Sequence, residues 1–373
     1  MLPFRLGMRV AGPEFCGRRP ELAQLREYMA GSGRVYVVGE RRMGKTSLVF
    51  EAARTLPGTR VVDADLMAAR SLGDVTQRLA AAVVRTQSGQ AGQSGQAGLL
   101  RLLKGLAQLR PTLGVDPLSG APTVSFAPGS GNHPDSLDAV FALIAAWPRA
   151  VVVIDEFQDV LGLPDPGAAL AQLRGLVQRQ PEAAFVFCGS VRHRMEDIFT
   201  RDDSPFFKAA MRMHVGPIDR GEFRDFLAAK FAESGRTVTP ELLDAICDLC
   251  HDNPGDVQRY CTALWQVTSD GQAVTDHDLP AAWEMVFAMH AQEYEVILRN
   301  LSAQQSQALR GLAALGGRSH LTGALLAAAG IALLPSLAKA LSVLAGKGLV
   351  VKEGTEYRIC DPFLIRWLVM RLS

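Results

Sequence analysis

Uninterrupted apolar runs mark three buried strands in the first half of the chain. Residues 35–38 read V-Y-V-V, residues 150–154 read A-V-V-V-I, and residues 185–188 read F-V-F-C. Runs without polar alternation are typical of strands that are covered on both faces of a parallel sheet. Apolar residues at helical spacing lie between them, as at residues 46–53 and 72–85. Strands that alternate with helices predict a doubly wound α/β domain.

Helical spacing dominates the chain beyond residue 219. Apolar side chains recur three or four positions apart through residues 223–231, 242–249 and 257–264. This period predicts amphipathic helices. We interpret them as a small helical lid over residues 218–298.

The pattern changes again near residue 300. Three more helices are expected there, followed by two short strands that flank a Gly354-Thr355 turn. This order of elements is typical of a winged helix-turn-helix, which we place at residues 299–373. The helices are expected at residues 302–315, 321–329 and 335–345, and the strands at residues 349–352 and 356–359.

Two segments interrupt the P-loop-type α/β core, which we place at residues 1–217. Residues 87–98 contain the unit S-G-Q-A-G twice, without a charge or a large apolar side chain, and predict a flexible insert. Residues 111–128 contain two short alternating runs on either side of a D-P-L-S-G turn. That arrangement predicts an inserted β-hairpin.

Composition narrows the class of protein. The chain has 373 residues, of which 48% are hydrophobic and 21% charged, as expected of a globular protein rather than a disordered one. The first five residues lack the apolar core of a signal peptide, so we expect a cytoplasmic protein. An uncharged stretch covers residues 321–338, but Gly330 and Pro335 interrupt it. We therefore expect two short buried helices there instead of a membrane span.

The candidate chemistry begins directly after the first strand. Residues 39–46 read G-E-R-R-M-G-K-T, which matches the phosphate-binding pattern G-x-x-x-x-G-K-T. Glycines let the backbone N–H groups turn around a β-phosphate, Lys45 reaches the β and γ oxygens, and Thr46 offers a hydroxyl to Mg²⁺. The sequence predicts Mg-ATP as the ligand, with GTP as the alternative. The expected nucleotide-binding residues of this loop are Gly39, Glu40, Arg41, Arg42, Met43, Gly44, Lys45, Thr46 and Ser47.

A pair of carboxylates follows the strand at residues 150–154. Asp155 ends that strand, where it would hold the Mg²⁺ shell together with Thr46. Glu156 comes next and is placed to orient and deprotonate an attacking water. An apolar strand that ends in Asp-Glu is the Walker B arrangement, and together with the loop at residues 39–46 it predicts hydrolysis of the nucleotide.

Segments along nearly the whole chain resemble one family. Residues 15–22 read F-C-G-R-R-P-E-L and are similar to the F-x-G-R-x-x-E-L segment of archaeal-type ATPases, which belong with the STAND and AAA-like P-loop proteins. The resemblance implies a helix at residues 99–109. It extends to the second strand at residues 61–65, the sensor-1 strand at residues 185–190, the N-P-G segment at residues 253–255 of the lid, and the D-P-F turn at residues 361–363.

The resemblance also implies roles for residues outside the two motifs. Arg18 and Pro254 fall in segments that would lie near the nucleotide, and Ser190 stands where similar ATPases contact the γ-phosphate or the attacking water. Lys208 occupies the position of an arginine finger, although a lysine cannot make the planar bidentate contact. The other finger candidates are Arg192, Arg194, Arg201 and Arg212.

Charge is distributed unevenly along the chain. Residues 301–373 contain eight Lys and Arg against three acids, a net charge of +5, whereas the whole chain carries +1. A basic winged helix is the footprint expected of a DNA contact, for which Lys339, Lys347 and Lys352 are the candidates. Residues 335–345, however, contain no Asn, Gln or Arg that could read base edges. Non-specific phosphate binding and protein docking are both open alternatives.

These features together predict an Mg-ATP-binding ATPase that acts as a conformational switch, with Glu156, Lys45 and Ser190 as catalytic residues. The first alternative is a DNA-acting ATPase, similar in build to replication initiators or helpers of mobile elements. The second is a nucleotide-binding scaffold with negligible turnover. Double-stranded DNA, a protein or further copies of the chain are the candidate partners.

Overall fold

The computed structural model describes residues 3–88, 106–107, 111–115, 122–126, 136–190 and 192–371. The chain divides into two compact units. The N-terminal unit comprises Val10–Arg41 and Lys45–Gly216, and the C-terminal unit comprises Met1–Arg9, Arg42–Gly44 and Pro217–Ser373. The sequence predicts three parts, with its first boundary at residue 217. The division of the C-terminal unit into a lid and a winged helix stays a prediction.

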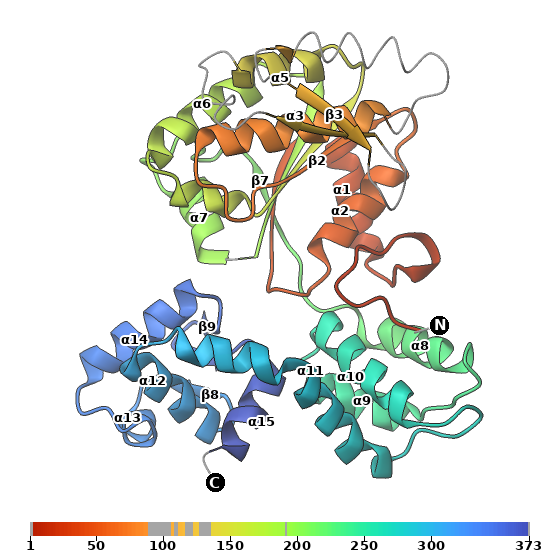
Figure 1. Ribbon diagram of the computed structural model, residues 1–373, viewed down its shortest axis with the longest axis vertical. Helices are drawn as coiled ribbons and strands as arrows, with labels where there is room; N and C mark the ends of the chain where they lie inside the picture. The colour runs from red at the N-terminus through yellow and green to blue at the C-terminus, as the bar shows by residue number, and fades with distance from the viewer. Residues whose placement is uncertain are drawn as a thin grey trace. The chain divides into compact units, whose positions relative to one another are not determined.

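A parallel sheet of five strands forms the centre of the N-terminal unit (Figure 1). Its order is β2-β5-β6-β1-β7, and every neighbouring pair is parallel. This arrangement confirms the doubly wound P-loop fold that the apolar runs predict. The strands are β1 (Arg34–Val38), β2 (Arg60–Asp65), β5 (Ala150–Asp155), β6 (Ala183–Gly189) and β7 (Met211–His214).

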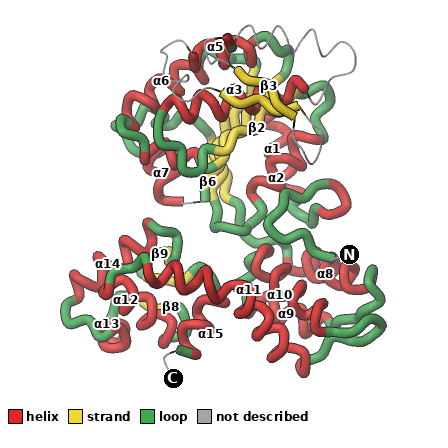
Figure 2. Tube along the Cα trace, viewed as in Figure 1, coloured by secondary structure: helices red, strands yellow, loops and turns green. Residues whose placement is uncertain are grey.

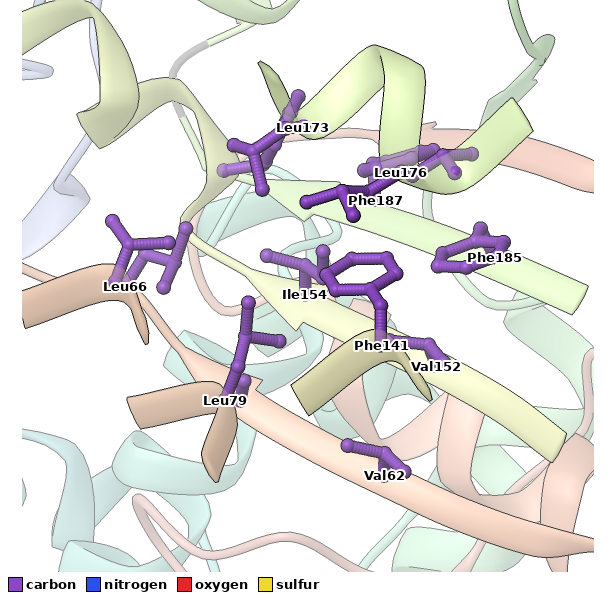
Figure 3. Close-up of a cluster of buried hydrophobic side chains, with 14 of the residues drawn as sticks. Val62, Leu66, Leu79, Phe141, Val152, Ile154, Leu173, Leu176, Phe185 and Phe187 are labelled. Atoms are coloured by element: carbon purple, nitrogen blue, oxygen red, sulfur yellow. The ribbon is translucent and has the colours of Figure 1, made fainter. Parts of the chain in front are cut away.

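Helices cover both faces of this sheet. On one face, side chains such as Val62, Ile154 and Phe187 pack against Leu79 and Leu173 of the covering helices (Figure 3). The helices on that face are α3 (Leu72–Ser88), α5 (Ser136–Ala145), α6 (Pro166–Gln178) and α7 (Arg192–Thr200), with the 3-10 helix η4 (Phe157–Gly162). The other face is covered by α1 (Arg19–Ala30), which follows η1 (Gly12–Glu14), and by α2 (Lys45–Arg54).

The two inserts of the core are described only in part. The strands β3 (Pro111–Val115) and β4 (Pro122–Phe126) pair in antiparallel fashion at the place where the sequence predicts a hairpin. Gln87 and Ser88 belong to α3, so these two residues are helical where the sequence predicts the start of a flexible insert at residues 87–98. Its remaining residues lie outside the described residues, as does the helix expected at residues 99–109 apart from residues 106–107.

Four helices open the C-terminal unit (Figure 2). The first three of these helices each have a capping residue whose side chain accepts hydrogen bonds from backbone N–H groups of the first turn: Asp219, Thr239 and Asn253. These N–H groups have no partner within the helix, so the caps stabilise the helix starts. The helices are α8 (Arg220–Ala232), α9 (Pro240–Leu249), α10 (Pro254–Val267) and α11 (Leu279–Arg299), with η5 (Asp276–Asp278) before the last.

Residues 303–370 contain three helices followed by a β-hairpin, which is the order of elements in a winged helix-turn-helix. The structure adds β8 (Arg318–His320), which pairs with β10 in a sheet of order β8-β10-β9. Three residues without apolar alternation gave no signal for this strand. The remaining elements are α12 (Ala303–Ala314), α13 (Gly323–Ala329), α14 (Leu334–Gly346), β9 (Val350–Glu353), β10 (Glu356–Ile359) and α15 (Pro362–Met370).

The uncharged stretch at residues 321–338 forms parts of two helices. The break between α13 and α14 turns the chain by 76°, and the two pass a test of length and hydropathy for a membrane span only when they are taken together. Within the described ranges, no single helix is both long enough and apolar enough to cross a bilayer.

Candidate functional site

The loop at residues 39–44 leaves the carboxyl end of β1, where ligands bind in open α/β sheets. A side chain at Gly39 would overlap the carbonyl oxygen of Val215, so this position accepts only glycine. Gly44 has a φ of +81°, in the left-handed region that glycine adopts without strain. The backbone geometry therefore explains both glycines of the motif.

Lys45 is the first residue of α2 and is only 7% exposed. Its Nζ donates to the carbonyl oxygens of Gly39 at 2.8 Å and Glu40 at 2.7 Å. Burial lowers the pKa of Lys45, while Cys188, Glu156 and Asp155 act in the opposite direction. The ammonium group thus lies inside the loop, next to the backbone that would surround a phosphate.

Thr46 and Asp155 bring the two halves of the expected Mg²⁺ site together. The Thr46 hydroxyl donates to Oδ2 of Asp155 at 2.8 Å, and burial raises the pKa of that carboxyl. A hydroxyl and a carboxylate in contact fit Mg²⁺, which takes few protein oxygens and completes its shell with phosphate and water. Among the residues that the structure describes, no cluster of three His, Cys, Asp or Glu could hold a metal by itself.

Glu156 follows with a φ of 50°, in the left-handed region that few residues other than glycine adopt. This conformation starts η4 and turns the carboxylate toward the end of β6. Oε2 of Glu156 accepts hydrogen bonds from the hydroxyl of Ser190 at 2.9 Å and from Nε2 of Gln158. The structure therefore brings Glu156 and Ser190, two of the predicted catalytic residues, into contact, and adds Gln158.

Arg42, at the tip of the loop, lies within the C-terminal unit. Its guanidinium contacts Asp256 of α10 at 3.0 Å and Asp361, the residue before α15, at 3.2 Å. Arg259 is within 3.8 Å of both carboxylates, and the Tyr294 hydroxyl donates to Asp361 at 3.4 Å. We call these five residues, Arg42, Asp256, Arg259, Tyr294 and Asp361, the carboxylate cluster.

The backbone at Arg42 takes part as well. The N–H of Gly255, in the first turn of α10, donates to the carbonyl oxygen of Arg42 at 3.1 Å. Arg42 itself has a φ of 65°. A loop residue in the left-handed region is thus held by both its side chain and its carbonyl group, and Pro254 lies beside this contact at the start of α10.

The protonation of Asp256 is the unusual property of the carboxylate cluster. Burial raises the pKa of Asp256 to about 6, although Arg42 and Arg259 favour the charged form, and the nearby Asp361 adds to the increase. The side chain is only 1% exposed. The loss of hydration therefore outweighs two ion pairs.

This property gives a pH prediction. Between the ordinary pKa of 3.8 and about 6, folded protein retains a proton on Asp256 that unfolded chain releases, so this group's contribution to stability is lost as the pH rises through that window. In the parent, the free energy of unfolding should therefore fall by at most about 3 kcal/mol as the pH rises through this window. Asp256→Asn should remove that decrease. Urea unfolding at several pH values between 4 and 7 measures this free energy. The fluorescence emission of Trp265, Trp283 and Trp367, which lie in the C-terminal unit, reports the unfolding. Equal pH slopes in parent and variant would contradict the assignment.

The remaining predicted residues have other surroundings. Arg18 is 4% exposed and donates to the carbonyl oxygen of Gly216 at 2.8 Å, so its nucleotide contact stays a prediction. Two finger candidates, Arg201 and Arg212, form ion pairs with Asp203 and Glu196. Lys208 lies over the ring of Phe207, Arg194 is half-buried, and the side chain of Arg192 lies outside the described residues.

Sequence reasoning missed Gln158 and most of the carboxylate cluster. Gln158 stands two residues after Glu156, and its position in the Walker B segment was a usable signal. Asp256 and Asp361 belong to segments that the family resemblance includes, but nothing in the sequence indicates that both contact Arg42. The two residues lie 214 and 319 positions after Arg42, and contacts at such separations leave no local pattern in a sequence.

Comparisons with known proteins agree with this geometry. The sequence matches the model of the family described as novel STAND NTPase 1 over residues 11–367. No curated protein sequence matches the chain significantly. The structure is similar to the Walker-type ATPase PABY2304 of Pyrococcus abyssi, with a TM-score of 0.69 and 19% identity over 98% of this chain and 99% of that one.

Two proteins of Aeropyrum pernix share the fold too. Its ORC2 protein, solved as ADPNP-ADP complexes, has a TM-score of 0.56 and 17% identity over 96% of each chain. Its ORC1 protein, solved in complex with DNA, has a TM-score of 0.51 and 14% identity over 96% of this chain and 95% of that one. At these identities the likeness establishes a shared fold.

Proposed function

Because the chain belongs to the novel STAND NTPase 1 family, we propose that it binds Mg-ATP at residues 39–46, hydrolyses it to ADP and phosphate, and changes conformation as it does so. One observation carries the proposal. The same eight-residue loop contains Lys45 and Thr46, which would contact the phosphates and Mg²⁺, and Arg42, which contacts the carboxylate cluster. A nucleotide that reshapes this loop would therefore act on α10 and α15 through Arg42.

The residues of the site support a simple division of labour. Lys45 would exchange the carbonyl oxygens of Gly39 and Glu40 for the β and γ oxygens of ATP. Thr46 and Asp155 would hold Mg²⁺, which neutralises phosphate charge when it is bound. Glu156 would accept a proton from the attacking water, and Ser190 would hold the carboxylate or the γ-phosphate.

The switch follows from the two sets of contacts that one short loop makes. Arg42 has a left-handed backbone and is fixed to Gly255 by its carbonyl group. Binding of the γ-phosphate beside Gly44 and Lys45 would change the loop conformation, and the guanidinium would move with it. A ligand shifts an equilibrium only as far as its contacts differ between the two states, and here the differing contacts are those of Arg42 with Asp256 and Asp361.

Phosphate release from Mg-ATP by the purified chain tests the enzymatic part of the proposal. We expect release that saturates with ATP, requires Mg²⁺ and stops when EDTA is added, because Thr46 and Asp155, which are in contact, would hold the metal. GTP in parallel measures the preference between the nucleotides. Tight binding of ATP without release would instead support a nucleotide-binding scaffold with negligible turnover.

Duplex DNA is a weaker candidate partner for residues 303–370. Of the basic side chains at residues 303–371, Arg318, Arg358 and Arg371 form ion pairs with glutamates, which leaves fewer charges for phosphates. Lys339, Lys347 and Lys352 are exposed. The start of α14, however, presents Leu333 and Leu334 to solvent, and neither can read a base edge by a hydrogen bond.

A further inference from the structure

Gln158 is a buried amide in contact with the proposed catalytic base. Its side chain is only 2% exposed, and its Nε2 donates to Oε2 of Glu156. The hydroxyl of Ser190 donates to the same oxygen at 2.9 Å. Since a carboxylate oxygen only accepts hydrogen bonds, the NH₂ end of the amide has to face Glu156. Two donors from different elements thus hold one oxygen of the base.

The backbone around Gln158 is arranged for this contact. Glu156 adopts a left-handed conformation, and η4 begins directly after it, with the N–H of Asp159 donating to the carbonyl oxygen of Glu156 at 2.9 Å. This tight turn brings residue 158 back over residue 156. A side chain at Gly189, the last residue of β6, would overlap Oε1 of Gln158 and the side chain of Met195. The amide therefore occupies space that glycine leaves open.

The oxygen end of the Gln158 amide indicates that this side chain has more than a structural role. Oε1 of Gln158 is buried and has no hydrogen-bond partner among the described residues. A buried polar atom without a partner destabilises a fold, and buried amides normally satisfy both ends. An apolar side chain of the same length would avoid that cost. What the glutamine adds at this position is its N–H group.

We propose that Gln158 is a positioning residue for ATP hydrolysis. The inference rests on the proposed function. With Oε2 held by Gln158 and Ser190, Oε1 of Glu156 is the oxygen that takes the proton of the attacking water. The water oxygen bonds to the γ-phosphorus, the bond from that phosphorus to the bridging oxygen breaks with its electron pair going to ADP, and the proton passes from Glu156 to solvent. Gln158 itself touches neither ATP nor water.

Gln158→Met tests the role of the amide, because methionine keeps the length and loses the N–H group. We expect kcat to fall about 10- to 100-fold, the effect of one hydrogen bond to a charged group, with KM for ATP unchanged within about twofold. The matched control is Gln180→Met. Gln180 is another buried glutamine of the N-terminal unit, but its Nε2 donates to the carbonyl oxygen of Phe141. This control should lose stability and keep kcat.

Glu156→Gln, measured in parallel, separates two kinds of failure. If Glu156→Gln is inactive and Gln158→Met has the kcat of the parent, the positioning role is wrong and the proposed function stands. If Glu156→Gln hydrolyses ATP like the parent, the proposed base is wrong and the inference about Gln158 fails with it.

A second variant gives a readout that a packing role would not change. Gln158→Glu places a carboxylate against Glu156, and two carboxylates in contact do not both ionise easily. We expect the acid limb of kcat to move to higher pH by about one unit or more. Recovery of turnover at high pH would support the inference. Loss of activity by the same factor at every pH would overturn it, because that is what misfolding around residue 158 produces.

Discussion

Replacing Lys45 with alanine should abolish the binding of Mg-ATP while the protein stays folded. The ammonium group is buried in the loop. In the G-x-x-x-x-G-K-T motif, the lysine is the charge that is expected to reach the β and γ oxygens. Charge-assisted hydrogen bonds are the strong ones, so the affinity should fall by on the order of 100-fold or more. Thermal unfolding with increasing Mg-ATP measures the loss, because a ligand that binds the folded state raises the midpoint.

A second buried lysine provides the control. Lys230 in α8 is 6% exposed and pairs with Glu233 at 3.2 Å, far from the motif in sequence. Lys230→Ala should lower the midpoint in the absence of nucleotide and keep the increase on adding Mg-ATP. If Lys45→Ala is stabilised by Mg-ATP as much as the parent, the assignment of the loop is wrong.

Glu156→Gln should separate binding from hydrolysis. Glutamine keeps the size of the side chain but cannot accept the water proton, so turnover should fall about 100-fold or more while ATP still binds. Phosphate release and nucleotide affinity, measured on the same preparation, test both halves. Asp138→Asn is a suitable control, since Oδ1 of Asp138 accepts a hydrogen bond from Arg179 at 2.8 Å and has no part in the proposed chemistry. Unchanged turnover in Glu156→Gln would move the base to Asp159 or Asp65.

The sequence predicts the core because the signals there are local and strong. Continuous apolar runs identify strands β1, β5 and β6, which are buried along their length, and the phosphate loop and the Asp-Glu pair stand at the ends of two of them. A buried parallel strand needs apolar side chains on both faces, so its sequence can hardly resemble a helix or a loop. For that reason the fold agrees with the expectation, and the motif residues lie at the ends of the strands that the sequence predicts.

What could not be predicted depends on contacts between distant residues. The three residues of β8 carry no alternation, and they form a strand only because β10 offers a partner. Likewise, Arg42, Asp256 and Asp361 meet although a charge at each position is compatible with an exposed loop or helix end. The space beside Gly189 that the Gln158 amide occupies could not be predicted from the sequence either, since a glycine at a strand end is usually explained by a turn.

Hydrogen exchange of Glu156→Gln, loaded with Mg-ATP or with Mg-ADP, tests the central claim most directly. The claim is that the γ-phosphate changes the contacts of Arg42 in the carboxylate cluster. We predict different exchange in the two nucleotides for the backbone at residues 253–262 and 361–367, and loss of this difference when Arg42→Met is added. The matched control is Arg224→Met, which breaks an ion pair with Asp244 in the same unit and should retain the difference. Identical exchange of both segments with ATP and ADP, at full occupancy of the site, would contradict the switch.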